Sequence, residues 1–412
     1  MDYAMQKLLC GPMQLRDNPA GTLACLSVRF ALEFNTGVSA RDVSYEQVER
    51  HMRLCIAAPS GLEDMITIAG SEPLLAEAAY HIMRDTRRHA VCHLADHSDL
   101  SCIDRGRRGE LVAALLIMQT YDAARVISDT RWISVANFME ALLPTPNYET
   151  LLQSGPTSWP IGDGIRKYDG TFKAIFKDYG MWFNHVIKIE RKEMISIDHL
   201  WKFVTRGAMI LCATNHDGID IVLPVYRISQ NLGPDSVTAI VIQVKNEPEL
   251  IDPSLFDVMD HVVKSAIFST HNVDSISDSD FESVATEIPE PEMVHPKPVI
   301  RLVFALASPE PAIIFRERPE VKLHSDGLTT FDIWLAGLSC DTFEQIQDEA
   351  DLQSYETLLE RSLVPHDGFK LKGRPTMGKK VRKAKGSSRR RMAPLALPRD
   401  SHHGIHLQRV VN

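Results

Sequence analysis

The chain has 412 residues, of which 44% are hydrophobic and 24% are charged, and its formal net charge is −9. This is the composition of a globular protein with room for two or three domains, and it excludes a fibrous or wholly disordered chain. The longest apolar run, residues 111–118, is too short to span a bilayer, and the first residues lack a secretion signal, so we expect an intracellular protein without a membrane segment. The seven cysteines, an odd number without a Cys-x-x-Cys pair, indicate reduced thiols.

Residues 1–143 are predicted to form a helical module, because apolar residues recur there at helical spacing and capping residues precede several of the runs. Residues 144–170 are rich in Pro, Gly, Ser and Thr, so they are expected to be a linker or an insertion. The helices expected in the module are 23–34, 44–58, 71–88, 109–126 and 133–143.

Residues 171–340 are predicted to form an α/β core. It is organised around three short runs rich in Ile and Val, bounded by Asn, Asp, Gly or Pro, which are typical of buried strands. These three strands are 208–213, 219–225 and 237–244. The other elements expected in the core are a strand over 183–189, helices over 197–204 and 253–268, strands over 299–307 and 312–316, and a helix over 331–349.

Three polar residues interrupt these strands. Asp220 lies at the start of the second run, and Gln243 and Lys245 lie at the end of the third. Residues two apart in a strand share a face, so Gln243 and Lys245 project together, and Asp220 can face them from the next strand. A carboxylate, an amide oxygen and an ammonium group on one patch suit a hard cation that holds a phosphate.

At these residues the sequence resembles the PD-(D/E)XK nuclease superfamily, and its Gly-Ile-Asp-Ile and Ile-Gln-Val-Lys segments are most similar to the modification-dependent restriction enzymes that use Gln-x-Lys. The resemblance implies a restriction-endonuclease-like core that hydrolyses DNA. It further implies that Asp220, Gln243, the carbonyl of Val244 and one helix acid bind Mg²⁺ or Mn²⁺, while Lys245 aligns or polarises the attacking water. Gln243 is neutral where many relatives carry a charge, so weaker metal binding is expected.

Two residues compete for the role of the helix acid. Glu110 lies at the first turn of a predicted helix, after a run of arginines, and Asp198 lies on the helix directly before the first strand. The family resemblance favours Glu110, whereas closeness in the sequence favours Asp198. Both remain candidates, and we take Glu110 as the predicted ligand.

A wider resemblance connects the chain with fungal NTPase–nuclease proteins related to Crinkler-type effectors and mobile elements. It rests on Glu72–Ala78, Arg105–Leu111 and Arg301–Ala307. In that family such helices follow an NTPase core, but this sequence has no phosphate-binding loop before them; the nearest match, Gly373–Lys380, lacks the Ser or Thr that reaches Mg²⁺. The chain therefore resembles a free-standing or truncated relative without its own NTPase; its protein partner stays open, and a separate NTPase is one candidate.

Residues 341–412 are predicted to be a helix followed by a disordered basic tail. Residues 370–391 hold eleven Lys and Arg and no acid, so the rest of the chain is strongly acidic, and an acidic loop is expected over 274–292. The tail has the spacing of a two-part nuclear import signal and would bind DNA phosphates; the alternative is a solubilising tail. Nuclear localisation is the expectation.

Two interpretations of function remain open. In the first, the chain is a metal-dependent DNA nuclease. In the second, the nuclease fold has decayed into a module that binds nucleic acid or a protein, and Asp220 only ends a turn after His216-Asp217-Gly218.

Overall fold

The computed structural model describes residues 1–11, 18–34, 38–58, 65–84, 90–96, 108–160, 170–213, 216, 218–246, 252, 254–268, 297–316, 322–324 and 328–363. The chain divides into two compact units, 1–364 and 365–412. The second unit and the predicted acidic loop over 274–292 lie outside the described residues. The expectations about the basic tail and that loop therefore stay predictions.

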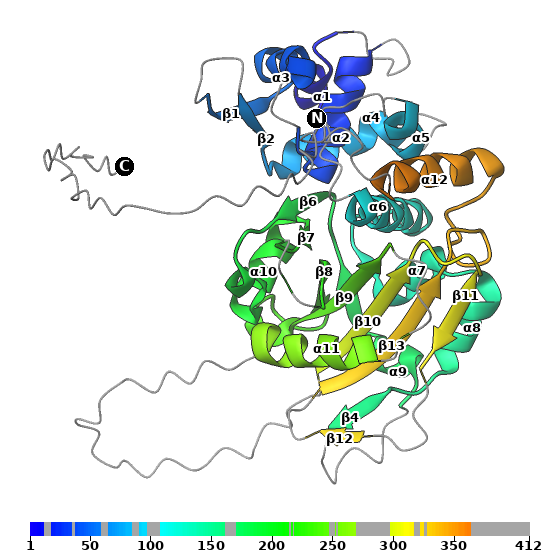
Figure 1. Cartoon of the computed structure of the whole chain (residues 1–412). Helices are drawn as coiled ribbons and strands as arrows, with labels where there is room; N and C mark the ends of the chain where they lie inside the picture. Colours follow the sequence, from blue (N-terminus) through cyan, green and yellow to red (C-terminus); the bar gives the residue numbers. More distant parts are fainter. Residues whose placement is uncertain are drawn as a thin grey trace, which may run out of the picture. The chain divides into compact units, whose positions relative to one another are not determined.

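The first unit is a mixed helix and sheet structure, and the predicted α/β class is confirmed at this level (Figure 1). Its helices near the N-terminus are α1 (Asp2–Leu9), α2 (Pro19–Phe30), α3 (Val38–Arg50), α4 (Pro73–Arg84), α5 (Ala90–Asp96) and α6 (Arg108–Ser128). The later helices are α7 (Val135–Leu142), α8 (Thr145–Gln153), α9 (Phe172–Ile175), α10 (Ile197–Arg206), α11 (Ser254–Val262) and α12 (Glu349–Leu363).

The N-terminal region is not all helical. The helix predicted over 44–58 begins earlier, at Val38, and ends at Arg50, and the chain then forms the antiparallel strands β1 (Arg53–Ala57) and β2 (Ile66–Ala69). Alternating apolar and polar residues indicate a half-buried strand, and the sequence of β1, Arg-Leu-Cys-Ile-Ala, lacks this pattern. Several apolar residues of β1 and β2 are exposed, because this two-stranded sheet leaves one apolar face at the surface.

The described strands of the core form an eleven-stranded mixed sheet in the order β12-β4-β13-β10-β9-β8-β5-β3, with β7 joining β8 to β6 and β11 pairing with β13. Its strands are β3 (Ile133–Ser134), β4 (Ser158–Pro160), β5 (Tyr179–Met181), β6 (His185–Lys188), β7 (Ala208–Leu211), β8 (Ile221–Arg227), β9 (Val237–Lys245), β10 (Lys297–Ala305), β11 (Ala312–Phe315), β12 (Lys322–His324) and β13 (Leu328–Ala336). The predicted linker over 144–170 thus contributes a helix and a strand.

The predicted three-strand meander is confirmed. β7, β8 and β9 follow one another in the sheet as antiparallel neighbours, and β10 then lies parallel to β9. The strands expected over 183–189, 299–307 and 312–316 are also present, as β6, β10 and β11. The helix expected over 253–268 is α11, which continues as a short π-helix.

The prediction of a helix over 331–349 is wrong. Residues 328–336 form the central strand β13, which pairs in parallel with β10, and the helix α12 begins only at Glu349. All nine residues of β13 are buried, the polar Thr329, Thr330 and Asp332 included, so this strand lacks the regular alternation of exposed polar and buried apolar residues that distinguishes a strand from a buried helix.

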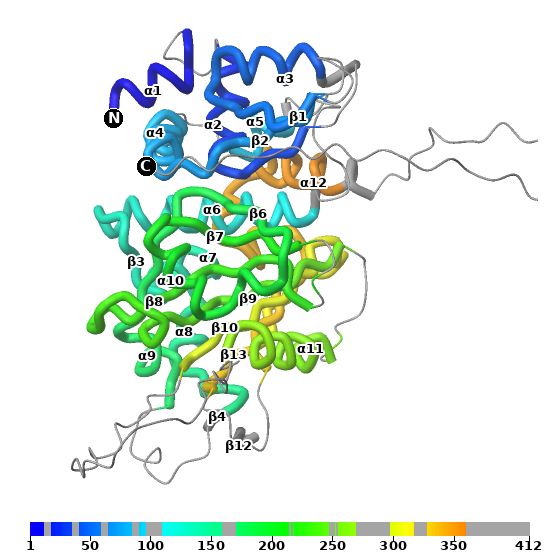
Figure 2. The backbone as a smooth tube through the Cα atoms, turned by 90° about the vertical axis from the view of Figure 1, so that its left-hand side faces the viewer, coloured from blue at the N-terminus to red at the C-terminus, as the bar shows by residue number. Residues whose placement is uncertain are grey.

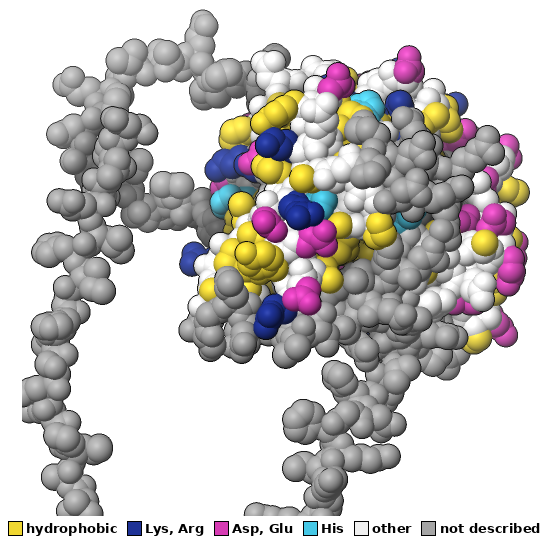
Figure 3. Space-filling model, turned by 90° about the horizontal axis from the view of Figure 1, so that it is seen from above, with side chains coloured by type: hydrophobic (Ala, Val, Ile, Leu, Met, Phe, Trp, Pro, Cys, Tyr) yellow, Lys and Arg dark blue, Asp and Glu magenta, His cyan; other side chains and the backbone are white. Residues whose placement is uncertain are grey.

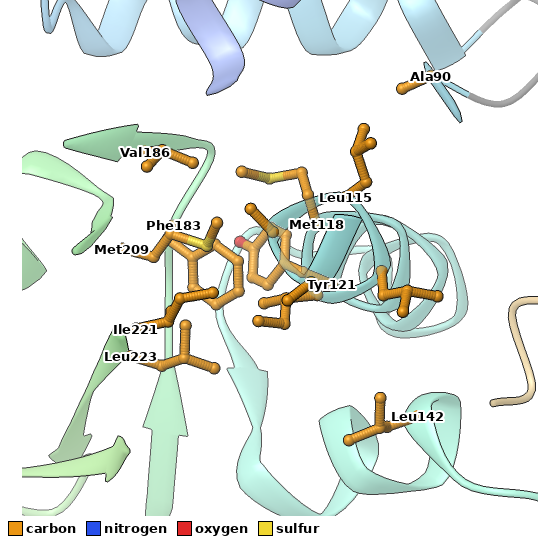
Figure 4. Close-up of a cluster of buried hydrophobic side chains, with 14 of the residues drawn as sticks. Ala90, Leu115, Met118, Tyr121, Leu142, Phe183, Val186, Met209, Ile221 and Leu223 are labelled. Carbon is orange, nitrogen blue, oxygen red and sulfur yellow. The ribbon is translucent and has the colours of Figure 1, made fainter. Parts of the chain in front are cut away.

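Helices cover both faces of the sheet. α10 and α11 pack on one face, while α6, α7, α8 and α9 pack on the other, where one hydrophobic core continues into the N-terminal helices (Figure 2). On this second face the ring centroids of Tyr121, on α6, and Phe183 are 4.4 Å apart. Both rings lie beside Met209, Ile221 and Leu223 of the sheet (Figure 4). α6 therefore joins the N-terminal helices to the sheet.

α6 is the one described helix that is long and apolar enough to cross a membrane, and 61% of its most apolar window is buried inside the protein. It thus has the surroundings of a core helix. On the described part of the face above the N-terminal helices, hydrophobic, basic and acidic side chains are interspersed (Figure 3).

Candidate active site

The three strands of the meander align one polar residue each at the same edge of the sheet. The Cys212 amide donates to the Asp220 carbonyl over 2.8 Å, and the Asp220 amide donates to the Ile242 carbonyl over 2.9 Å. The first bond continues the β7–β8 register, so Cys212 lies directly opposite Asp220. The second is displaced by one residue from the β8–β9 register, in which Ile221 pairs with Ile242, so Asp220 forms a β-bulge opposite Ile242, next to Gln243 along β9.

Gln243 and Lys245 lie on the face of the sheet that α10 and α11 cover. In β9, Ile240 and Ile242 belong to the core on the α6 side, whereas Ala239 and Val241 belong to the core under α10 and α11. Gln243 and Lys245 continue the odd-numbered series, so both lie on the α10 and α11 face, as the alternation of the sequence predicts.

Asp220 directly precedes β8, and its carboxylate is partly buried. Its Oδ2 accepts a hydrogen bond of 2.7 Å from the backbone N–H of Val244, the only side-chain hydrogen bond of Asp220 among the described residues. Burial raises the pKa of Asp220, and the Val244 N–H and the Lys245 ammonium partly oppose that rise. The carboxylate therefore lies where a nearby cation would stabilise its charge.

Gln243 lies beside Asp220 and is 9% exposed. Its side-chain oxygen Oε1 is buried and has no hydrogen-bond partner among the described residues. A buried acceptor without a partner costs about 1–3 kcal/mol, so it needs a compensating role. This oxygen is thus available to a ligand.

Val244 presents its carbonyl to the same place. Carbonyls two residues apart in a strand point the same way, and the Ile242 carbonyl accepts from the Asp220 amide. The Val244 carbonyl therefore points toward the β8 side, where Asp220 lies.

Lys245 ends β9 with a half-buried side chain. Its ammonium is near enough to lower the pKa of Asp220 and that of the exposed Asp252, whose pKa is lowered mainly by hydrogen bonds with Ser254. Lys245 is thus close to both carboxylates.

Glu110 comes to this edge from α6. A β carbon added at Gly109 would lie 1.6 Å from the Asn246 Nδ2, so the first turn of α6 packs directly on the residue after Lys245. Burial raises the pKa of the Cys212 thiol, and the carboxylates of Asp220 and Glu110 raise it further. Both acids therefore lie around Cys212.

Asp198 occupies a different place. It lies on the first turn of α10 with an exposed side chain, and it is not among the charges that perturb Cys212 or Asp220. Of the two candidate helix acids, the structure brings Glu110 to the meander.

The sequence did not single out Cys212 and Asn246. The signal for Asn246 was a polar residue directly after Lys245, together with a glycine before Glu110, because only glycine allows so close an approach of the two segments. Nothing in the sequence marked Cys212, which has the residue type of an ordinary buried thiol.

The described residues contain no group of three or more His, Cys, Asp and Glu side chains placed to hold a metal ion. A cation at this edge would therefore depend on amide and carbonyl oxygens besides the carboxylates of Asp220 and Glu110.

Comparison with curated proteins gave no match, and comparison with solved structures gave none either. One family does match: residues 17–252 fit the model of a domain of unknown function, DUF8736. The matched segment covers more than half of the chain and includes Glu110, Asp220, Gln243 and Lys245. The chain therefore belongs to the DUF8736 family.

Proposed function

We propose that the protein hydrolyses DNA phosphodiester bonds with Mg²⁺ or Mn²⁺, at a restriction-endonuclease-like core within residues 171–340. The observation that carries this proposal is the buried Oε1 of Gln243, which has no partner among the described residues, close to the Asp220 carboxylate, which accepts a hydrogen bond from the next residue, Val244. Their closeness at the end of β9, with Lys245 two residues beyond Gln243, supports a site for a cation and a phosphate.

The donor set fits a hard divalent ion. Asp220, the Gln243 amide and the Val244 carbonyl supply oxygen, and Glu110 adds a second carboxylate from α6; oxygen is the ligand that Mg²⁺ and Mn²⁺ prefer. When bound, the ion would supply Lewis-acid stabilisation of charge on the phosphate. One neutral amide among the ligands favours modest affinity, so the substrate phosphate would contribute to binding.

Lys245 has the chemistry of the catalytic cation. Its ammonium donates up to three hydrogen bonds, so it can orient the attacking water and stabilise the negative charge that develops on the phosphate oxygens. Its charge is near enough to the Asp220 carboxylate to lower the pKa of that group.

The basic tail is proposed to hold the nucleic acid. Most of the chain is acidic and would repel a phosphate backbone, whereas residues 370–391 concentrate eleven cations. The proposal thus separates binding of the polymer, in the tail, from cleavage, at the sheet edge.

A plasmid-nicking assay tests the proposal. The full-length protein with Mg²⁺ or Mn²⁺ is expected to nick supercoiled DNA, and Asp220→Asn should abolish nicking because it removes the charge but keeps an acceptor for the Val244 N–H. Glu110→Gln and Asp198→Asn form a matched pair of carboxylate-to-amide changes. Loss of activity is expected only for Glu110→Gln.

Two results would count against catalysis at this place. The first is nicking that survives Asp220→Asn, which would indicate a contaminant or another site. The second is equal effects of Glu110→Gln and Asp198→Asn, which would mean that neither carboxylate has a specific role.

A binding module without catalysis is the second candidate. It is favoured by the neutral Gln243, by the burial that raises the pKa of Asp220, and by the absence of a three-residue His, Cys, Asp and Glu cluster in the described part. In that case the wild type would bind DNA without nicking it, and Asp220→Asn would leave DNA affinity unchanged.

A further inference from the structure

A second cluster of reactive groups lies away from the meander site, where the loop before α4 meets the edge strand β6 (Figure 1). The Ser71 hydroxyl oxygen is 2.9 Å from Nε2 of His185. His185 is completely buried at the start of β6, and Ser71 is half-buried. A hydroxyl therefore contacts a shielded imidazole.

The neighbours of His185 determine its tautomer. Asn184 Nδ2 donates to the Pro73 carbonyl over 3.2 Å and to Glu77 Oε2 over 3.1 Å, and both of these partners can only accept. The amide orientation is thereby defined, so Asn184 Oδ1, 2.8 Å from His185 Nδ1, must accept the imidazole N–H. Nε2 is left as the acceptor for the Ser71 O–H.

Ser71 also lines a cavity of about 490 Å³. At this wall Nη2 of Arg206 is 2.5 Å from the Ser71 carbonyl oxygen and 3.2 Å from its hydroxyl oxygen. The guanidinium thus places positive charge beside the hydroxyl. Much of the remaining cavity wall is apolar, and it includes Val28, Leu32, Leu54, Ile68 and Val186.

Burial lowers the pKa of His185 to about 4, and the guanidinium groups of Arg206 and Arg29 act in the same direction. The imidazole is therefore neutral at pH 7 and can accept a proton. The two arginines oppose its protonation, whereas hydrogen bonding to the Gly207 backbone favours it. Turnover by such a base should be slow.

We propose that Ser71 is the nucleophile of an acyl-transfer site that hydrolyses esters of apolar carboxylic acids. His185 is the general base, Asn184 orients it, Arg206 faces the carbonyl oxygen, and the apolar wall holds the acyl chain. The arrangement of nucleophile, base and orienting group, opening on a cavity, carries the proposal.

The reaction has two halves. In the first, Ser71 Oγ attacks the ester carbonyl carbon and gives its proton to His185 Nε2; the ester C–O bond breaks, and His185 returns the proton to the departing alcohol. In the second, water attacks the acyl-Ser71 ester, and His185 takes the water proton and gives it to Ser71 Oγ as that bond breaks. The products are an alcohol and a carboxylic acid, and the enzyme is restored.

The test uses the full-length protein with EDTA, so that metal-dependent chemistry is absent. Hydrolysis of p-nitrophenyl acetate, butyrate and octanoate is measured, and a fluorophosphonate probe is mapped by mass spectrometry. We expect the longer esters to react faster, the probe to label Ser71, and Ser71→Ala to lower hydrolysis on the order of a hundredfold.

Ser196 supplies a matched control. Its hydroxyl oxygen is 2.8 Å from Nδ1 of His199, but Ser196 directly precedes α10, His199 lies on the first turn of that helix, and neither lines the cavity. Ser196→Ala should leave hydrolysis unchanged, and Ser196 should remain unlabelled.

Hydrolysis that persists in Ser71→Ala, or labelling of Ser196 in preference to Ser71, would overturn the proposal. If Ser71→Ala fails to fold, labelling of the wild type decides alone, and an unlabelled Ser71 after prolonged exposure to the probe overturns it. Because no metal is present, these outcomes are independent of the proposed DNA hydrolysis.

Discussion

Two polar clusters lie on the same face of the sheet, and they differ in whether their groups are paired. In the first, Arg301 on β10 uses all five of its N–H donors: two to Asp332, one to Asp260, one to the Phe256 carbonyl and one to Thr330 Oγ1, over distances of 2.6–3.2 Å. Both the Arg301 and the Asp332 side chains are almost completely buried. We call this cluster the closed network.

The second cluster is the meander site of Asp220, Gln243 and Lys245. It begins one strand away, where Gln243 faces Val303, two residues beyond Arg301. Here the Gln243 Oε1 is buried without a partner among the described residues. Full pairing suits a cluster that holds the fold, whereas an unpaired buried oxygen suits a cluster that binds something else.

The closed network also supports the meander site. It ties α11 to the sheet through Asp260, and α11 in turn packs on the loop that leads to Asp220. Gly218 in that loop has a φ of +75°, and a β carbon there would lie 2.7 Å from Val258 of α11. Loss of the network should therefore disturb the site as well as the fold.

The largest expected effect comes from breaking the closed network. Arg301→Met leaves the Asp332 carboxylate buried without its main partner, so the free energy of unfolding should fall by about 3–5 kcal/mol. Urea denaturation measures it. The exposed Arg191→Met is the control and should change stability by less than about 0.5 kcal/mol. A similar small loss for Arg301→Met would contradict the structural role.

The next largest effect is expected at the meander site. Lys245→Met should lower the rate of DNA cleavage on the order of a hundredfold to a thousandfold, with Mn²⁺ still bound, because it removes a cation from the transition state but no metal ligand. Plasmid nicking measures the rate of cleavage, and calorimetric titration with Mn²⁺ measures metal binding. Lys173→Met, an exposed lysine, should change neither. A joint loss of metal binding and cleavage would argue that Lys245 is structural.

His185 is a third buried group, and it tests whether a full set of hydrogen bonds by itself shows that a group is structural. The His185 ring is bonded through both nitrogens, yet it is neutral, since burial and then Arg206 lower its pKa from 6.5 to about 4. The unfolded chain therefore binds this proton more tightly than the folded protein does. The stability from His185 should be complete above pH 6.5 and fall by about 3 kcal/mol as the pH drops to 4.

Urea denaturation between pH 7 and pH 4.5 measures this loss in the wild type. His185→Gln should flatten the pH dependence, while His199→Gln, at a partly exposed ring on α10, should not. An equally steep dependence in His185→Gln would assign the effect to other groups, such as Glu77, whose partners Arg125 and Asn184 oppose its burial and lower its pKa.

The smallest expected effect is a change in Mn²⁺ affinity. It shows whether Gln243 belongs to a binding site or only to the structure of the fold. If Gln243 is a metal ligand, Gln243→Glu adds a carboxylate at the same reach, and Mn²⁺ affinity should rise about tenfold, or 1.4 kcal/mol. If Gln243 only ends a buried strand, the new charge should destabilise the fold and leave metal affinity unchanged. Calorimetry beside a melting curve for the same protein distinguishes these outcomes.

Much of the core was predictable because its signals are local. The meander strands are short Ile and Val runs bounded by turn residues, and the structure confirms all three. The prediction over 331–349 was wrong for a physical reason: the Asp332 within β13 is buried only because Arg301, on another strand, pairs with it. A sequence does not reveal such a partner, so it does not show that a run containing Asp332 is buried as a central strand.

The sequence by itself determined which residues of one strand share a face. Gln243 and Lys245 project together because the backbone of a strand alternates every two residues, whatever surrounds it. Only the tertiary structure decided which acid joins them. Asp198 is the nearer in sequence but lies exposed on α10, whereas Glu110 reaches the site because Gly109 lets α6 pack against Asn246. Contacts between residues a hundred positions apart depend on how the whole chain closes around its core, and no local periodicity encodes that closure.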